Sequence, residues 1–323
     1  MKFKAFKCWL VAMILIMSCG KEPGVQTEPF IYLHVAAQRV ALATKPYTKP
    51  VRLLDSLQIM SNIQYLSSDT CAGRSPGTPG HARALERIAT HFRKTGLDSF
   101  GNRLVQTFNG SYSIEGKNIV GWLKGTTNPE KYIVITAHYD HFGTINGATY
   151  YGADDNASGV ACIMALASYF SKHPHRYSLV FAVLDKEETG LEGAHNLVRE
   201  FESTNKLPAI KMNLNLDMVA RSDSNEIFAC GIKRYPALRY LVDSVQSKTN
   251  VKLLMGHDGG NSGDDWTKSS DHSPFNDKEI PFLYIGVEDH ANYHQTTDTY
   301  SRINPHRYLE NCNMIASILL AVR

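Results

Sequence analysis

The stretch from His138 to Glu188 decides the fold of this chain. It contains TAHYDHFG (residues 136–143), GADDNASG (152–159) and VFAVLDKEETG (180–190). The first and third segments end apolar runs of strand length with polar side chains, and the second is a glycine-flanked acidic turn that opens an apolar helical pattern. Polar side chains at successive strand ends outline a metal site with a base beside it.

Strand and helix patterns alternate along most of the rest of the chain. The pattern predicts strands at 104–109, 118–123, 132–137, 179–184, 212–218, 227–230, 251–254 and 280–287, and helices at 53–66, 81–95, 159–170, 190–201, 236–249 and 305–322. Pro129 and Glu130 are expected to turn the chain before the strand at 132. This alternation predicts an α/β fold with a mixed, mainly parallel central sheet flanked by helices. A length of 323 residues fits one such domain after an N-terminal extension.

The N-terminus reads as a targeting segment. Three lysines precede the apolar run CWLVAMILIM at 8–17, which is too short for a membrane span. The order Ile16-Met17-Ser18-Cys19 resembles a bacterial lipobox, which makes 1–18 a lipoprotein signal peptide and Cys19 the lipidated residue. The alternative is an ordinary signal peptide with an incidental cysteine. Residues 19–50 are then a tether and N-terminal arm.

The predicted location follows from this N-terminus. We expect an exported bacterial lipoprotein that reaches the membrane through the lipid anchor on Cys19. Gly20, in place of an aspartate, favours anchoring in the outer membrane of a host that has two membranes. The sequence leaves open whether the protein faces the periplasm or the outside.

Charge and cysteine content exclude two classes of function. The formal net charge of +3 includes the three lysines of residues 1–18, so the remainder is about neutral and nothing indicates a nucleic acid partner. Cys71, Cys162, Cys230 and Cys312 form no CxxC pair, so a thiolate zinc site is not expected. Their pairing in disulfides cannot be read from the sequence.

The polar residues at the strand ends form one set of candidate ligands. His138 and Asp140 end one strand, and Glu187 and Glu188 follow another. Asp217 ends a third strand, and His294 lies just past a fourth. Any one of these residues alone is more often structural, but their joint occurrence favours a nitrogen and oxygen ligand set for zinc, or alternatively cobalt or manganese. An aspartate of GADDNASG could bridge two metals. Of the adjacent glutamates, one can bind metal while the other acts as general base.

These motifs resemble the M28 (leucine-aminopeptidase-like) metallopeptidases, which carry co-catalytic zinc on an α/β sheet. The resemblance covers most of residues 51–323 through SSDTCAGRSPGTPGHARALE (67–86), TAHYDHFG (136–143), GADDNASG (152–159), LDKEETGLEG (184–193), NLDMVA (215–220), SSDHSPF (269–275) and YHQTTDTYSRIN (293–304). It implies a peptidase domain over 51–323. In that domain His138 and Asp217 would bind one zinc, Glu188 and His294 the other, and Asp155 would bridge the two. The resemblance also implies Glu187 as general base, Asp140 as acceptor from the imidazole of His138, and Tyr293 as donor to the oxyanion.

The resemblance also implies a cis bond after Asp155. For Tyr293, the alternative to an oxyanion donor is a tyrosine that only packs. His141, His272 and His290 lie near the motifs but are not expected to be metal ligands. The glycine-rich loop 256–265 matches no motif of the family.

The function implied by the resemblance is that of a zinc-dependent exopeptidase with two zinc ions per chain. An aminopeptidase is favoured, in which metal-bound hydroxide, formed with Glu187, attacks the peptide substrate. The first alternative is a glutaminyl-cyclase-like acyltransferase, which shares the fold and uses one zinc. The second alternative is a non-catalytic peptide-binding relative. The preferred residue, carboxypeptidase or dipeptidase action and the oligomeric state are left open.

Overall fold

The computed structural model describes residues 51–222, 224–259 and 264–323. The predicted signal peptide, the lipidated Cys19 and the tether over 19–50 lie outside the described residues. Within them runs a nine-stranded sheet of order β1-β3-β7-β4-β8-β11-β9-β10, with β2 beside β3, and a separate β5-β6 hairpin. The strands are β1 (Asp98–Ser99), β2 (Val105–Phe108), β3 (Gly116–Leu123), β4 (Asn128–His138), β5 (Gly143–Ile145), β6 (Ala148–Tyr150), β7 (Tyr177–Leu184), β8 (Ile210–Leu216), β9 (Glu226–Cys230), β10 (Lys252–Met255) and β11 (Phe282–Gly286).

The centre of the sheet is parallel. Strands β7, β4, β8 and β11 pair in parallel, whereas β3 joins β7, and β9 joins β11, in antiparallel fashion. The predicted α/β class with a mixed, mainly parallel sheet is therefore confirmed. Because the four central strands share one direction, their carboxyl ends meet at one edge of the sheet.

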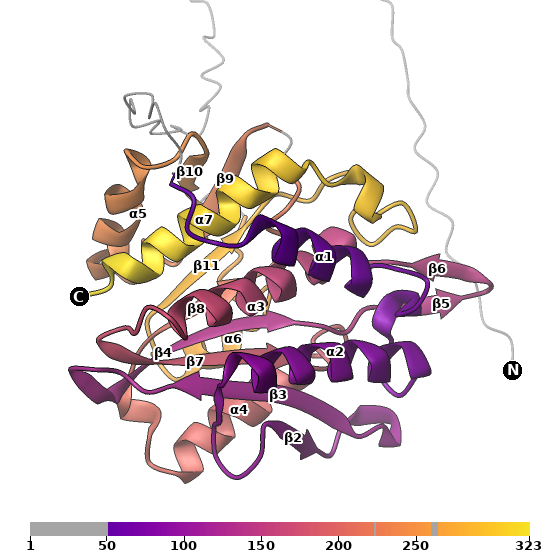
Figure 1. Ribbon diagram of the computed structural model, residues 1–323, viewed down its shortest axis with the longest axis horizontal. Helices are drawn as coiled ribbons and strands as arrows, with labels where there is room; N and C mark the ends of the chain where they lie inside the picture. The colour runs from indigo at the N-terminus through magenta and orange to yellow at the C-terminus, as the bar shows by residue number, and fades with distance from the viewer. Residues whose placement is uncertain (1–50, 223, 260–263) are drawn as a thin grey trace, which may run out of the picture. The chain divides into compact units, whose positions relative to one another are not determined.

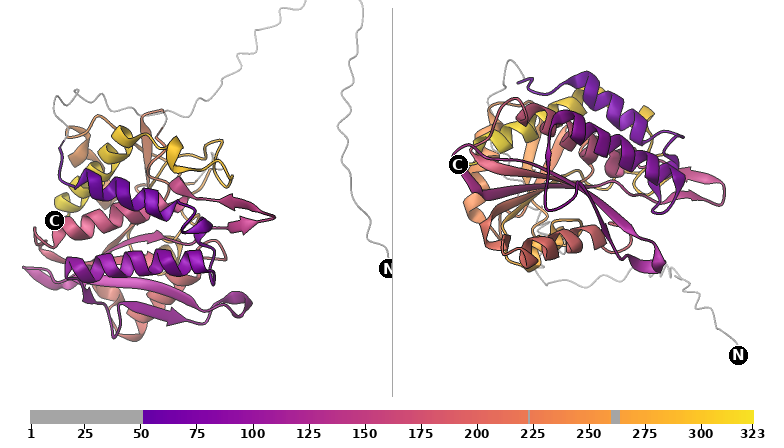
Figure 2. Two further views of the ribbon diagram at one scale, coloured as in Figure 1. Left: turned by 45° about the vertical axis from the view of Figure 1, so that its right-hand side comes forward. Right: turned by 60° about the horizontal axis from the view of Figure 1, so that its bottom comes forward.

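Helices cover both faces of the sheet (Figures 1 and 2). They are α1 (Ser56–Leu66), α2 (Pro79–Thr95), α3 (Gly159–Phe170), α4 (Glu192–Ser203), α5 (Arg239–Gln246), α6 (Ser273–Asp277) and α7 (Pro305–Ala321). On one face, α3 packs against α1, α2 and β4, and α7 packs against α1 and α5. The other face carries α4 and α6, which pack against each other. In the right-hand view of Figure 2 the sheet lies between these two layers.

Strand β7 shows why this sequence requires two covered faces. All eight of its residues are buried. Leu179, Phe181 and Val183 belong to the core beneath α1, α2, α3 and α7, whereas the alternate residues Val180, Ala182 and Leu184 belong to the core beneath α4. Successive strand side chains point to opposite faces, so a strand that is apolar throughout must be covered on both sides.

Two expectations about local structure are wrong, and four short elements were missed. Pro129 and Glu130 do not turn the chain but lie inside β4, where a bulge between Asn128 and Tyr132 absorbs the proline. The helix expected over 236–249 splits into a 3₁₀ turn (Pro236–Leu238) and α5. The elements β1, β5, β6 and α6 were not expected, since each is too short to show a period.

No helix in the described part of the chain has the length and apolar character needed to cross a bilayer. This finding concerns the peptidase-like region only, because the N-terminal segment lies outside it.

Packing beneath α4 gives a test of the fold. Phe201 is fully buried on α4, with its ring centroid 4.6 Å from that of Phe100. Phe201→Ala should lower the free energy of unfolding by about 3–5 kcal/mol, because the lost ring leaves a cavity. The measurement is urea denaturation, with Leu57→Ala as control, since Leu57 is 81% exposed. The control should change stability by less than about 0.5 kcal/mol. Equal effects of the two variants would contradict this account of the core.

Candidate metal centre

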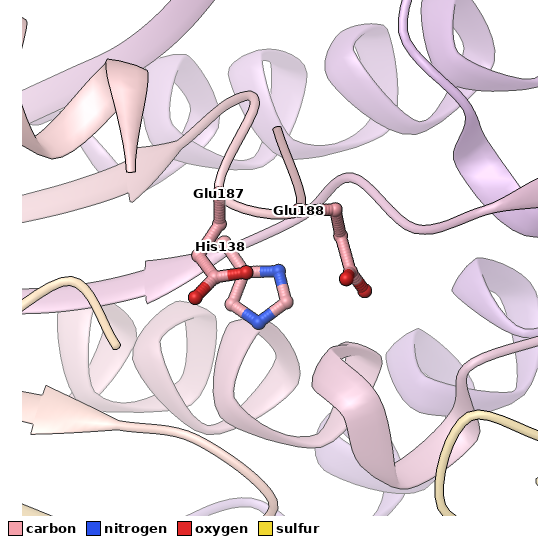
Figure 3. Close-up of side chains that lie close together, drawn as sticks. All are labelled: His138, Glu187 and Glu188. Carbon is pink, nitrogen blue, oxygen red and sulfur yellow. The ribbon is translucent and has the colours of Figure 1, made fainter. Parts of the chain in front are cut away.

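The predicted site residues meet at the carboxyl edge of the sheet. His138 is the last residue of β4, Glu187 and Glu188 lie in the loop after β7, and Asp217 directly follows β8. His294 lies in the loop after β11. Figure 3 shows His138 at its strand end beside the two glutamates, which come from one loop. The parallel pairing of β4 with β7 and β8 brings these side chains together.

One group of donors surrounds the imidazole of His138. Its Nε2 lies 3.3 Å from Oδ1 of Asp155 and 3.4 Å from Oδ1 of Asp217. Ser270 Oγ donates to the other carboxylate oxygen of Asp217 at 2.7 Å. Oδ1 of Asp217 is buried and has no hydrogen-bond partner among the described residues. A cation between this oxygen and Nε2 of His138 would give the oxygen the partner that it lacks.

A second group of donors lies on the other side of Asp155. His294 Nε2 is 3.1 Å from Oδ2 of Asp155 and 3.8 Å from Oε2 of Glu188. The two carboxylate oxygens of Asp155 thus face two different groups, which is the arrangement of a bridging carboxylate. The Asp155–Asn156 peptide bond is cis, as the resemblance implied.

His141 was not expected in the centre, but the structure places it there. The side chain is buried, and its Nδ1 lies 2.7 Å from Oε1 of Glu188 and 3.7 Å from Oδ2 of Asp155. His141, Asp155 and Glu188 form one of the residue groups that could hold a metal ion. The only sequence signal was the histidine that directly follows HYD, and this position does not reveal where its ring points.

Asp140 acts differently from the expectation. Its carboxylate lies 3.7 Å from Nδ1 of His138, which is too far for a hydrogen bond. The imidazole instead faces the main-chain oxygen of Asp140 at 3.2 Å. The carboxylate accepts the backbone N–H groups of Glu187 at 3.1 Å and Glu188 at 3.3 Å. Asp140 therefore orders the loop that carries the glutamates.

Two further residues hold the acidic turn at 152–159. Asp298 accepts the backbone N–H groups of Asp154 and Asp155 through Oδ2, at 3.0 and 3.1 Å. Arg74 is fully buried and donates to the main-chain oxygens of Tyr139 and Gly152, at 2.8 and 2.9 Å. The sequence reading did not single out Arg74, although it lies in the loop of the SPGTPG motif. These contacts hold the acidic turn at 152–159 and the loop after β4 in place.

The remaining predicted residues line a cavity beside the donors. The cavity has a volume of about 360 Å³ and contains His138, Asp155, Glu187, Glu188, Asp217, Tyr293 and His294. The ring of Tyr293 stacks on that of His294, with centroids 3.7 Å apart. Trp266, Met218 and Val287 add an apolar wall, and Asp289 adds an acid. The cavity can therefore receive a small apolar group next to the donors.

Electrostatics in the centre favour a cation. Burial, together with neighbouring carboxylates, raises the pKa of Glu187 and of Glu188 well above the usual range. Burial also raises the pKa of Asp271 to about 8. Burial opposes protonation of His138, yet the charges of Asp217 and Glu187 raise its pKa well above the usual value. A bound dication would keep these carboxylates ionised and the imidazole neutral.

The donors also suit the size and chemistry of zinc. Ligands about 2.0–2.2 Å from one zinc ion lie roughly 3.3 Å apart in a tetrahedron. The separations of 3.3 and 3.4 Å around His138, and 3.1 Å between His294 and Asp155, agree with that spacing, whereas His294 and Glu188 are wider apart at 3.8 Å. Imidazole and carboxylate groups are accepted zinc ligands.

The sheet and its donor groups place this chain among the α/β proteins whose metal site is built from loops at the carboxyl ends of parallel strands. The model of Peptidase family M28 matches residues 118–319, which is more than half of the chain. The chain belongs to peptidase family M28.

Curated relatives match only part of their own length. The alkaline phosphatase isozyme conversion protein of Escherichia coli is 28% identical over 186 residues, which cover 52% of this chain and 53% of the relative. A probable zinc metalloprotease of Pyrenophora teres f. teres is 29% identical over 188 residues, which cover 52% of this chain and 39% of the relative. The matches thus span about half of the length of these relatives, or less.

Solved structures share the fold across most of the chain. The glutaminyl cyclase of Fimbriiglobus ruber gives a TM-score of 0.68 at 19% identity, covering 88% of this chain and 100% of that one. An aminopeptidase from Aneurinibacillus sp. strain AM-1 gives 0.65 at 17% identity, covering 83% and 93%. At such identity the likeness shows the fold alone.

The buried acid Asp271 predicts a pH dependence of the metal-free protein. Neither carboxylate oxygen of Asp271 has a hydrogen-bond partner among the described residues. Its folded pKa of about 8 exceeds the value in the unfolded chain, so its protonation stabilises the fold below about pH 4 and this contribution is lost as pH rises towards 8. Chelator-treated protein should therefore lose stability between pH 5 and pH 8.

The variant Asp271→Asn isolates this effect. It should reduce the loss of stability between pH 5 and pH 8 by on the order of 3 kcal/mol, because the amide cannot ionise. Urea denaturation at several pH values measures the loss, and Asp277→Asn, on the surface side of α6, is the control. An unchanged slope in Asp271→Asn would refute the assignment.

Proposed function

We propose that this chain is a zinc-dependent aminopeptidase that binds two zinc ions. The observation that carries the proposal is the pair of donor groups that share Asp155, each oxygen of which faces a different imidazole. His138 and Asp217 would hold one ion, and Glu188 and His294 the other. Zinc is favoured over cobalt or manganese by the names of the curated relatives.

The chemistry of the proposal divides between the metal and the protein. Bound zinc supplies a Lewis acid that polarises the scissile carbonyl and lowers the pKa of water. Glu187 lines the cavity together with the donors, and it would take the proton from water and pass it to the leaving amine. The burial that raises its pKa suits a group that must both accept and release a proton.

Aminopeptidase action is favoured by the walls of the cavity. Asp289 and the glutamates provide negative charge that suits a free amino terminus, and Trp266, Met218 and Val287 suit an apolar first side chain. Tyr293 is placed to donate to the developing oxyanion, since it lines the same cavity. Solved neighbours of this fold include aminopeptidases, which adds support.

A glutaminyl-cyclase-like acyltransferase is the second candidate. It is favoured by the several cyclase structures among the neighbours, one of which is matched over its whole length. The unpartnered Oδ1 of Asp217 beside His138 argues for a second metal, and therefore for hydrolysis. We also propose that the protein is an exported lipoprotein anchored in the outer membrane through Cys19, and that its substrates are peptides outside the cytoplasm.

The general base gives the most direct prediction. Glu187→Gln should keep both zinc ions while the rate of peptide hydrolysis falls by at least about 10²–10⁴-fold, because the amide cannot take a proton. The measurement combines metal content with kcat on an aminoacyl substrate. Glu86→Gln, on α2, is the matched control, since 64% of the Glu86 side chain is exposed. Hydrolysis by Glu187→Gln at the parental rate would disprove this mechanism.

Substrate panels separate the candidate activities. An aminopeptidase should cleave aminoacyl anilides and free peptides, leave N-acetylated peptides intact and lose activity with chelator, because the free amine is part of recognition. Release of C-terminal residues from blocked peptides would instead show a carboxypeptidase. Cyclisation of N-terminal glutamine without hydrolysis would favour the cyclase.

A further inference from the structure

His141 was not expected to be a metal ligand, yet it lies beside the carboxylate of Glu188. Its loop follows β4, and the loop that carries Glu188 follows the neighbouring parallel strand β7. The hydrogen-bonding contact between Nδ1 and Oε1 of Glu188, at 2.7 Å, therefore joins the two loops that face the metals. The other oxygen of Glu188, Oε2, is the one that faces His294.

The distances separate a hydrogen-bond partner from a metal ligand. Donors that share one zinc ion lie roughly 3.3 Å apart, whereas a charge-assisted hydrogen bond to a carboxylate spans about 2.7–2.9 Å. The contact of His141 with Glu188 has the second length, and the contacts of His138 and His294 with Asp155 have the first. His141 is thus spaced as a donor to Glu188.

The two ring nitrogens of His141 have different surroundings. A carboxylate that binds a cation is ionised and can only accept, so Nδ1 carries the hydrogen in this contact. Nε2 is buried without a hydrogen-bond partner among the described residues. A buried imidazole with one orphaned nitrogen is costly, so a ring needed only for packing would be better served by an apolar side chain. The polar contact with Glu188 is the one that requires a histidine.

Aromatic packing fixes the direction of this contact. The ring of His141 stacks on Phe142, with centroids 4.6 Å apart and planes 24° apart. Phe142 also meets the ring of His294 edge-on at 4.7 Å. Phe142 therefore contacts both imidazoles that flank the Glu188 carboxylate, of which His141 faces Oε1 and His294 faces Oε2. The ring also lies close to the turn at Gly152, because a Cβ at that position would lie 2.6 Å from Cδ2 of His141.

We propose that His141 is a positioning residue for the second zinc: its Nδ1–H holds Oε1 of Glu188, which leaves Oε2 free for the metal on the side of His294. The proposal rests on the proposed two-zinc function. Partners that orient a ligand in this way typically contribute about 10- to 100-fold to metal affinity.

The test measures zinc binding rather than activity. Zinc stoichiometry and both dissociation constants are determined for the full chain by competition with a chromophoric chelator. His141→Phe keeps the stack on Phe142 but loses the donor, so one dissociation constant should rise by about 10- to 100-fold while the other stays unchanged. His141→Asn keeps an N–H donor near the position of Nδ1 and should recover most of the affinity.

Controls make each outcome decisive. His91→Phe removes a histidine whose Nε2 contacts Met164 O on α3, away from the centre, and should leave both constants unchanged. If His141→Phe does not fold, as judged by circular dichroism, His141→Ala replaces it. Parental affinities in His141→Phe would overturn the proposal, and so would equal losses in His141→Phe and His141→Asn.

The same measurement separates this inference from the proposed function. A parent chain that binds one zinc ion overturns both. A parent that binds two zinc ions and shows the expected ranking of variants, but hydrolyses no peptide, overturns the aminopeptidase proposal and supports the role of His141.

Discussion

Burial of several carboxylates at one edge of the sheet is the constraint on which the site depends. Asp155, Asp217 and Asp271 are almost fully withdrawn from water, and only 10% of the Glu188 side chain is exposed. Burial disfavours the charged form of each group, and each further carboxylate adds to the cost. A bound cation would offset this cost, with neutral His138 and His294 as nitrogen donors on opposite sides of Asp155.

The family match begins at residue 118, but the segment before that residue also supports the site. Arg74 donates to the main-chain oxygens of Leu66, Tyr139, Tyr151 and Gly152. It therefore connects the end of α1 to the loop after β4 and to the start of the acidic turn at 152–159. His81, in the first turns of α2, contacts Asp185 at 2.8 Å, two residues before Glu187. A buried guanidinium satisfied by carbonyl groups adds positive charge near Asp155 without neutralising it. The N-terminal helices thus organise the loops as well as cover the sheet.

The sequence contained most of the fold because the central strands are apolar throughout and the helices are long enough to show a period. It also placed His138, Glu188, Asp217 and His294 at one edge, since parallel strand ends must meet, whereas Asp155 was assigned only through the resemblance to the family. Directions of side chains beyond the strand ends were not accessible. Asp140 follows β4 and turns to the backbone of Glu187, and His141 turns to Glu188. Arg74 was missed because its partners are main-chain oxygens, which leave no pattern in the sequence.

The fold does not choose between hydrolysis and cyclisation, since both activities occur among its structural neighbours. In either proposed reaction Glu187 would act as the base. The reactions differ in the attacking group, which is water in hydrolysis and the substrate's own amine in cyclisation. In the proposed hydrolase, a second cation beside His138 would position the water. That cation would depend on Asp217, whose unpartnered Oδ1 faces His138 at 3.4 Å with the spacing of a shared metal. Ser270 holds the other oxygen of Asp217 and so keeps Oδ1 directed at that position.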